Sequence, residues 1–217
     1  MSVRRAPTRS GAQPYVSRGG AKLERALDAF AIDVSGTAAL DAGASTGGFT
    51  DCLLRRGAAH VVAVDVAYGE FAWALRNDPR VRLLERTNVR TLDLVAVGEE
   101  PVDLVVADLA FISLRVVRDA LLGAAQADAE FILLVKPQFE APRGRVEKGG
   151  VVRDPEVWRE AMRSVADAYR SAGCVVAGAC ASPLVGPAGN REFFLHLQRG
   201  GTDAGDAVLA AAIEGAP

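Results

Sequence analysis

Five polar residues of this 217-residue chain stand at or near the ends of short apolar runs, where they could do chemistry together. They are Asp41, Asp65, Asn88, Asp108 and Lys136. The carboxyl ends of parallel strands share one edge of a sheet, and open α/β proteins bind their ligands there. One such charge can simply mark the end of a strand, but five on one edge predict a binding site.

A glycine-rich turn with the sequence DAGASTGGF extends from Asp41 to Phe49. Its glycines would let a ligand approach the backbone, and Asp65, at the end of the next apolar run, could bind ribose hydroxyls. The turn does not have the GxGxxG spacing of dinucleotide sites. An acid at the head of the turn suits a cofactor with a cationic amino-acid end, so we expect S-adenosylmethionine.

Lys136 follows the apolar run Phe131 to Val135 and precedes Pro137. A lysine at the centre of the sheet edge can orient or help to deprotonate a weakly acidic hydroxyl, and Asp108 can pair with it. Two simpler roles stay open: Lys136 as a lysine that only reaches solvent, and Asp108 as a helix N-cap. Lys22 and Glu192, taken alone, are typical of a helix surface and of a strand edge.

The elements that must position these residues alternate along the chain. Apolar runs predict strands at residues 37–40, 60–64, 81–84, 104–107, 131–135, 174–181 and 193–197. Helices are expected after Gly20 and at residues 47–56, 69–76, 114–125 and 154–172. This order predicts a doubly wound, Rossmann-like α/β fold whose sheet is mostly parallel, with an antiparallel edge hairpin made by the last two strands.

Length and composition predict one domain with a flexible segment at each end. Half of the residues are hydrophobic and the net charge is −2, which argues against a stand-alone nucleic-acid binder. We expect a flexible basic arm at residues 1–14, a catalytic domain at 15–199 and a flexible acidic tail at 200–217. The arm could bind phosphates or could only aid solubility.

Several classes of protein are excluded by what the sequence lacks. The three cysteines have no metal-ligand spacing, so neither a metal site nor disulfides are expected. No apolar run is long enough for a membrane span, and no secretory signal is present. We therefore expect a cytoplasmic enzyme. His60 and His196 are expected to be structural.

Six segments together resemble the TlyA family, the hemolysin A-like branch of the FtsJ-like ribose 2′-O-methyltransferases. They are YVSRGGAKL from Tyr15, the turn from Asp41, DVAYG from Asp65, ERTN ending at Asn88, LVKPQF around Lys136 and GNREF around Glu192. The resemblance covers about Tyr15 to Leu197. Family members carry a small RNA-binding domain before the YVSRGG segment, whereas fourteen residues precede Tyr15 here.

The resemblance implies a Lys-Asp-Lys-Glu catalytic set, which falls on Lys22, Asp108, Lys136 and Glu192. It also implies a cofactor pocket with Asp65 at the ribose and Asn88 near the adenine. The full set of expected cofactor-binding residues is Asp41, Gly43, Ser45, Thr46, Gly47, Gly48, Phe49, Asp65, Asn88 and Asp108.

The expected function is S-adenosylmethionine-dependent 2′-O-methylation of RNA, on cytidine in ribosomal RNA or ribosomal subunits, without a metal. A protein partner that supplies RNA affinity is compatible with this. One alternative is a small-molecule O-methyltransferase on the same scaffold, and another is a cofactor-binding protein without turnover. Arg143, Arg145, Lys148 and Arg153, in one loop, favour RNA over a small molecule.

Overall fold

The computed structural model describes residues 14–216, so the expected basic arm lies, apart from Pro14, outside the described residues. The strands form one sheet in the order β3-β2-β1-β4-β5-β7-β6. Their bounds are β1 Ala38–Ala42, β2 His60–Val64, β3 Val81–Leu84, β4 Val102–Ala107, β5 Ala125–Val135, β6 Cys174–Ala181 and β7 Phe193–Arg199. Strands β1 to β5 pair in parallel, while β7 runs antiparallel to both β5 and β6. The predicted fold class is confirmed.

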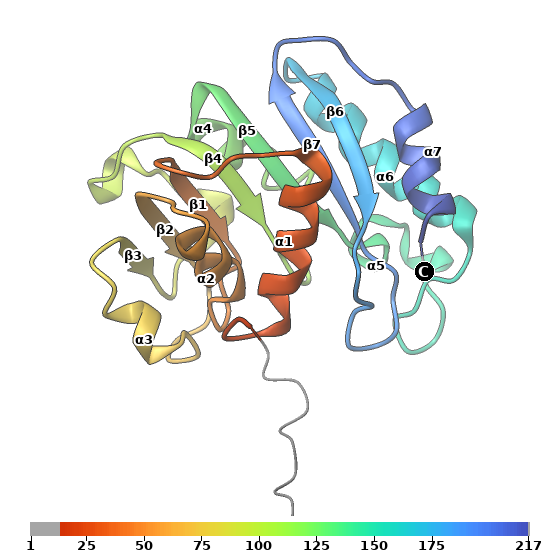
Figure 1. Cartoon of the computed structure of the whole chain (residues 1–217). Helices are drawn as coiled ribbons and strands as arrows, with labels where there is room; N and C mark the ends of the chain where they lie inside the picture. Colours follow the sequence, from red (N-terminus) through yellow and green to blue (C-terminus); the bar gives the residue numbers. More distant parts are fainter. Residues whose placement is uncertain (1–13, 217) are drawn as a thin grey trace, which may run out of the picture.

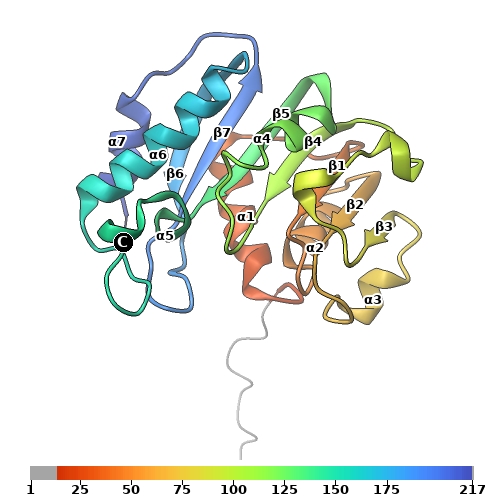
Figure 2. The same ribbon diagram turned by 180° about the vertical axis from the view of Figure 1, so that it is seen from behind.

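Helices cover both faces of the sheet (Figures 1 and 2). One face carries α1 (Arg18–Phe30) and α2 (Gly48–Arg55), and the other carries α4 (Arg118–Gly123) and α6 (Pro155–Arg170). The short helices α3 (Trp73–Arg76) and α5 (Pro137–Glu140) follow β2 and β5. Each face has its own apolar core, because the side chains of the buried strands alternate between the two layers.

Helix α6 shows how the sequence specifies an element. Asp154 caps it by accepting a hydrogen bond from the backbone N–H of Glu156, and Pro155 occupies its first position. Met162, Val165 and Tyr169 recur at helical spacing and are fully buried against the sheet. The expected helix at 154–172 is therefore confirmed, with bounds within two residues.

Several elements differ from expectation. β5 begins at Ala125 rather than at residue 131, because Ala125 pairs with Val102 of β4. β1 continues through Ala42 because Asp41 pairs in register with Ala63 on one side and Val106 on the other. The helix expected at 69–76 is restricted to α3, since Gly69 has a φ of +80° and begins a turn. The helix expected at 114–125 is restricted to α4, because Leu114 is instead bonded to a side chain of α5.

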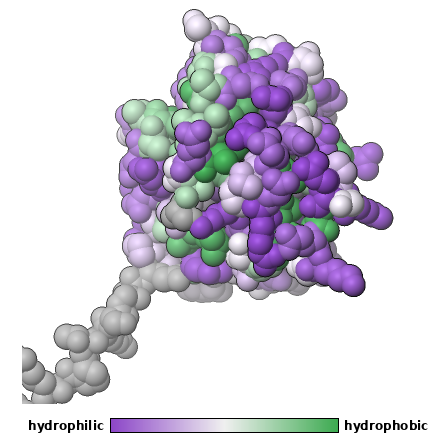
Figure 3. Space-filling view, turned by 90° about the vertical axis from the view of Figure 1, so that its right-hand side faces the viewer, coloured by the Kyte–Doolittle hydropathy of each residue, from purple (hydrophilic) through white to green (hydrophobic). Residues whose placement is uncertain are grey.

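The prediction of a flexible acidic tail at 200–217 is wrong, because residues 207–214 form helix α7 (Ala207–Glu214). Leu209 and Ile213 of α7 are buried against the sheet and α6. Seen from the side on which α7 lies, the surface is largely hydrophilic, with smaller hydrophobic areas (Figure 3). The alanine-rich end of the chain thus completes the core.

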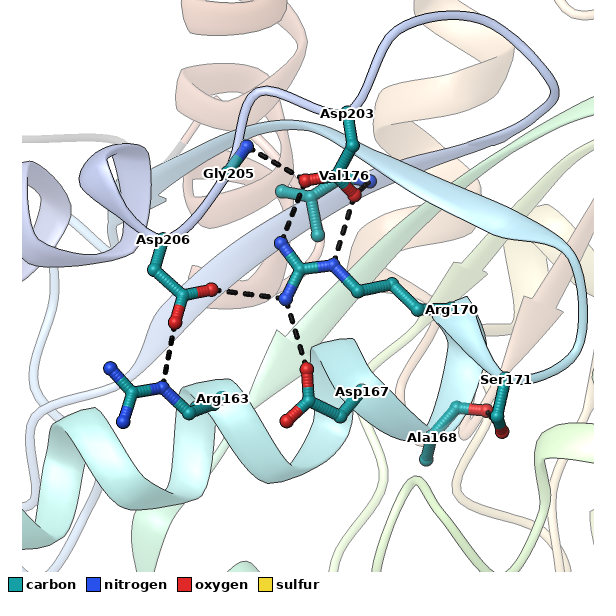
Figure 4. A network of polar contacts seen from close by, with 9 residues as sticks. All are labelled: Arg163, Asp167, Ala168, Arg170, Ser171, Val176, Asp203, Gly205 and Asp206. Atoms are coloured by element: carbon teal, nitrogen blue, oxygen red, sulfur yellow. Dashed lines mark hydrogen bonds and ion pairs between the residues drawn. The ribbon is translucent and has the colours of Figure 1, made fainter.

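Asp203 and Asp206 hold this end of the chain to α6 (Figure 4). Arg170 pairs with both aspartates, at 2.8 and 3.0 Å, and Arg163 pairs with Asp206 at 2.7 Å. Asp203 also accepts the backbone N–H of Val176 in β6. The hydrogen bonds from Arg170 hold the pKa of Asp203 well below its usual value. These acids therefore act as structural anchors.

Among the helices of residues 14–216, none combines the length and the apolar character that crossing a bilayer requires.

Candidate active site

A cavity of about 330 Å³ opens at the edge of the sheet where the parallel strands end, at the lower limit of the ~300–1,000 Å³ usual for ligand pockets. Five separate segments of the chain meet around it. Its lining residues are Ser17, Arg18, Gly19, Lys22, Gly43, Ala44, Ser45, Thr46, Gly48, Phe49, Asp108, Ala110, Lys136, Pro187 and Glu192.

Lys136 and Asp108 form an ion pair on one wall of the cavity. The Nζ of Lys136 lies 2.5 Å from Oδ1 of Asp108, and the two side chains are 12% and 21% exposed. They meet because β4 and β5 are neighbours in the sheet and the chain leaves both strands at the same edge. Pro137 begins α5 directly after the lysine. The pair therefore rests on two rigid strands.

Lys22 and Glu192 form a second ion pair on the cavity wall. The Nζ of Lys22 lies 2.5 Å from Oε2 of Glu192, with side chains 11% and 2% exposed. The lysine comes from α1 and the glutamate from the segment that leads into β7, 170 residues later. Both ion pairs join residues far apart in sequence, so spacing along the chain does not reveal them.

The glycine-rich turn forms the floor of the cavity. Gly43 has a φ of +89°, and a Cβ there would lie 2.6 Å from the carbonyl oxygen of Asp108. Its N–H and that of Ala44 donate to the carbonyl of Val64, which ties the turn to the end of β2. Only glycine permits this close approach, so the turn stays in contact with Asp108 at the end of β4.

Gly48 brings α1 against the same turn. A Cβ at Gly48 would lie 2.2 Å from Oγ of Ser17, at the start of α1. The absence of a side chain there lets the first turn of α1 close one side of the cavity. Ser17, Arg18 and Gly19 line the cavity but were not predicted as site residues; the YVSRGGAKL segment that contains them was their only signal in the sequence.

Four of the expected cofactor residues do not line the cavity: Asp41, Gly47, Asp65 and Asn88. Asp65 accepts hydrogen bonds from the N–H groups of Ser45 and Ala67, each at 2.7 Å, and so holds the turn against β2. Its carboxylate keeps further acceptor positions. Asn88 is exposed and accepts the N–H of Arg90, while Gly47 is the N-cap of α2.

Asp41 was expected to open the turn at the sheet edge, but it lies inside β1 and is fully buried. Its Oδ2 accepts a 2.6 Å hydrogen bond from the Thr50 hydroxyl. Its Oδ1 has no hydrogen-bond partner among residues 14–216. Burial, and then the nearby charges of Asp108 and Asp65, raise the pKa of Asp41 to about 7. The carboxyl group therefore lies inside the sheet, beneath the turn.

These features fit S-adenosylmethionine. The absence of a side chain at Gly43 lets a ligand approach the backbone closely, and Asp65 offers acceptors for ribose hydroxyls. The carboxylate of Asp108 lines the cavity, and Asp41 adds negative charge from below when it is ionised, which suits a cationic amino-acid end. The two lysines face the same space, so an acceptor hydroxyl could be held there as well.

Phe111 is an exposed aromatic residue just beyond the cavity, and it was not predicted as a site residue. It is 91% exposed, has a φ of +63° and packs edgewise near Phe139, with ring centroids 5.3 Å apart. An exposed ring held in an uncommon backbone conformation is a surface on which a nucleobase can stack. Its sequence signal, an aromatic three residues after Asp108, is too common to identify it.

Comparisons with known proteins agree with this arrangement. The sequence profile of the FtsJ-like methyltransferases matches residues 15–199. TlyA of Mycobacterium tuberculosis, a 16S/23S rRNA (cytidine-2′-O)-methyltransferase, is 58% identical over 184 residues, which cover 85% of this chain and 68% of that protein. Hemolysin A of Brachyspira hyodysenteriae is 38% identical over 84% of this chain and 76% of its own length.

A solved structure is similar over nearly the whole described chain. A protein from Lactococcus lactis described as a hemolysin is 38% identical and superposes with a TM-score of 0.89, covering 94% of this chain and 98% of that one.

Proposed function

The chain belongs to the FtsJ-like methyltransferase family, and on this basis we propose that it transfers the methyl group of S-adenosylmethionine to the 2′-hydroxyl of cytidine in ribosomal RNA. The reaction is that of the TlyA relative, with which this chain shares 58% identity over 184 residues. An RNA substrate also agrees with the resemblance that the sequence motifs carry.

The observation that carries the proposal is the meeting of two lysine–carboxylate pairs around one cavity. Lys136–Asp108 and Lys22–Glu192 come from four separate segments, yet all four side chains line the cavity beside the glycine-rich turn. A site that only bound the cofactor would not need two partly buried ammonium groups facing the remaining space, because each costs desolvation energy. The pairs are suited to hold a hydroxyl acceptor.

The chain's own residues would act on the acceptor. When bound, S-adenosylmethionine supplies an electrophilic methyl group. The Nζ of Lys136 would orient the ribose 2′-hydroxyl. After Lys136 has released a proton to solvent, its neutral amine would accept the hydroxyl proton as the oxygen–methyl bond forms and the methyl–sulfur bond breaks. Asp108 holds Lys136 in place, Glu192 holds Lys22, and Lys22 contacts the ribose or its phosphate. Orientation of the hydroxyl supplies much of the acceleration.

The cofactor would rest on the turn from Gly43 to Phe49, with Asp65 at the ribose and Asn88 near the adenine. Asp41 does not line the cavity; in its ionised form it would stabilise the cationic end through space, from beneath the turn. No metal ion enters this mechanism, because a sulfonium would leave as a neutral thioether and needs no Lewis acid.

RNA would be bound by basic side chains near the cavity. In the loop that follows α5, Arg145 pairs with Asp154 and Glu160, and Arg153 pairs with Glu147. Arg143 and Lys148 are exposed and have no ion-pair partner within the described residues, so they are the loop's candidates for phosphate contacts. A protein partner could add to this affinity.

The test is incubation of the protein with methyl-labelled S-adenosylmethionine and either purified ribosomal RNA or intact ribosomal subunits. We expect label on RNA, resistance of one phosphodiester to alkali at the labelled nucleotide, and 2′-O-methylcytidine after digestion. Label on a base rather than a ribose would contradict the proposed chemistry. Label only on small molecules of a cell extract would favour the small-molecule alternative.

A further inference from the structure

The segment that begins at Asp108 has no regular structure, yet Asp108 is half of the Lys136–Asp108 ion pair. Residues 108–117 link β4 to α4, and Phe111 within them has a positive φ. Asp108 itself is fixed at one end by the hydrogen bond from its N–H to the carbonyl of Ala42. A loop of this kind needs a second anchor if its carboxylate is to stay beside Lys136.

Glu140 provides that anchor from the end of α5. Its side chain is only 1% exposed. Oε1 accepts the backbone N–H of Leu114 at 2.7 Å, and Oε2 accepts the Ser113 hydroxyl at 2.5 Å and the Nε–H of Arg115 at 3.3 Å. The carbonyl oxygen of Glu140 accepts a further bond from Arg115. One buried carboxylate therefore holds three consecutive residues of the loop.

Successive residues of Lys136 and α5 contact successive residues of the loop in the same order along the chain. Lys136 meets Asp108, Phe139 lies against Phe111, and Glu140 binds Ser113. The first two pairs are offset by the same three residues on both segments. Since α5 begins immediately after Lys136, the contacts that hold the loop on α5 also restrain Asp108 relative to Lys136.

We propose that Glu140 is a positioning residue for the methyl-transfer reaction: it fixes the loop of residues 108–115 on α5 and thereby sets the Lys136–Asp108 pair. It touches neither the cavity nor any residue of the glycine-rich turn. The proposal rests on the proposed function for its kinetic consequence, but the anchoring itself is a property of the chain alone.

The test compares Glu140→Gln with wild type and with Asp203→Asn. Asp203 is a fair control, because it too accepts backbone N–H groups and an arginine, from Val176, Gly205 and Arg170, yet it anchors α7 far from the cavity. The glutamine keeps the shape of the side chain but turns an N–H group toward one of the loop's donors. Ser113→Ala is a milder second variant that removes a single donor.

We expect the single-turnover rate of Glu140→Gln, at saturating RNA and cofactor, to fall on the order of tenfold to a hundredfold. Its affinity for S-adenosylmethionine by calorimetry should change less than threefold. Ser113→Ala should show a smaller fall, and Asp203→Asn should keep the wild-type rate at a temperature where both remain folded. An equal rate loss in Asp203→Asn would attribute the effect to general destabilisation and overturn the proposal.

A second readout does not depend on catalysis. Amide hydrogen exchange of residues 109–115 should accelerate in Glu140→Gln and stay unchanged in Asp203→Asn, where exchange should instead rise around α7. If wild type methylates no RNA, the proposed function fails, and the exchange of this loop still decides whether Glu140 anchors it. Unchanged exchange at 109–115 in Glu140→Gln would overturn the inference.

Discussion

Replacing Asp41 by asparagine should stabilise the protein at neutral and alkaline pH while weakening cofactor binding. The carboxyl group is fully buried, one of its oxygens lacks a partner within the described residues, and burial raises its pKa from the ordinary 3.8 to about 7. In the unfolded chain Asp41 loses its proton near pH 4, whereas in the folded protein it keeps the proton until about pH 7. Stability therefore falls as pH rises from about 4 to 7.

The size of the effect follows from the two values. Each pH unit between them corresponds to about 1.4 kcal/mol, so the cost of ionising Asp41 in the folded protein reaches about 4 kcal/mol at pH 8. Asparagine has nearly the same shape, can still accept the Thr50 hydroxyl and carries no charge. The free energy of unfolding of Asp41→Asn should match that of wild type near pH 4 and exceed it by up to about 4 kcal/mol at pH 8.

The assay is urea unfolding of both proteins at pH 4.5 and pH 8 without cofactor, with calorimetry of S-adenosylmethionine binding at pH 8. Asp203→Asn serves as the control of opposite sign. Since the pKa of Asp203 is lowered by Arg170, its contribution is present above about pH 4, and its loss should destabilise the protein at pH 8. A stability difference between Asp41→Asn and wild type that is equal at both pH values would refute the reasoning.

Three further predictions concern other residues in and around the site. Asp65→Ala should weaken S-adenosylmethionine binding by on the order of 2–3 kcal/mol in calorimetry, because the ribose hydroxyls lose their acceptor. Phe111→Ala should weaken RNA binding by about 1–3 kcal/mol in a filter or fluorescence assay, with cofactor affinity unchanged, if a base stacks on the ring. Lys22→Met should lower the free energy of unfolding by about 3–5 kcal/mol by leaving Glu192 buried without its partner, and adding Glu192→Gln should restore stability but not turnover.

The central parts of the sheet could be predicted from the sequence because local pattern decides them. The bounds of β2 and β3 are as expected, since each is a short apolar run closed by polar residues or turns. Asp108 and Lys136 were placed at neighbouring strand ends for the same reason, and the structure brings them to 2.5 Å. Because β1 to β5 run parallel, their carboxyl ends all lie on one edge of the sheet.

The remaining features depend on contacts between distant segments. Asp203 and Asp206 look like part of a solvated tail in the sequence. Their pairing with arginines of α6, together with the burial of Leu209 and Ile213, orders the end of the chain. Asp41 appears to end a strand because it is charged, but pairing on both sides carries β1 past it. The anchoring by Glu140 is equally invisible, because it joins segments about 26 residues apart without a repeating pattern.

The most direct test of the account is the single-turnover rate of Lys136→Ala measured together with its affinity for S-adenosylmethionine. Under the proposed function Lys136 acts on the acceptor hydroxyl. We therefore expect the rate of methyl transfer to RNA to fall by at least about a hundredfold, the scale of general acid–base catalysis, while cofactor affinity stays close to wild type. Lys136→Arg should not restore the rate, since a guanidinium stays protonated and has a different shape. A Lys136→Ala protein that methylates RNA at the wild-type single-turnover rate would contradict the account.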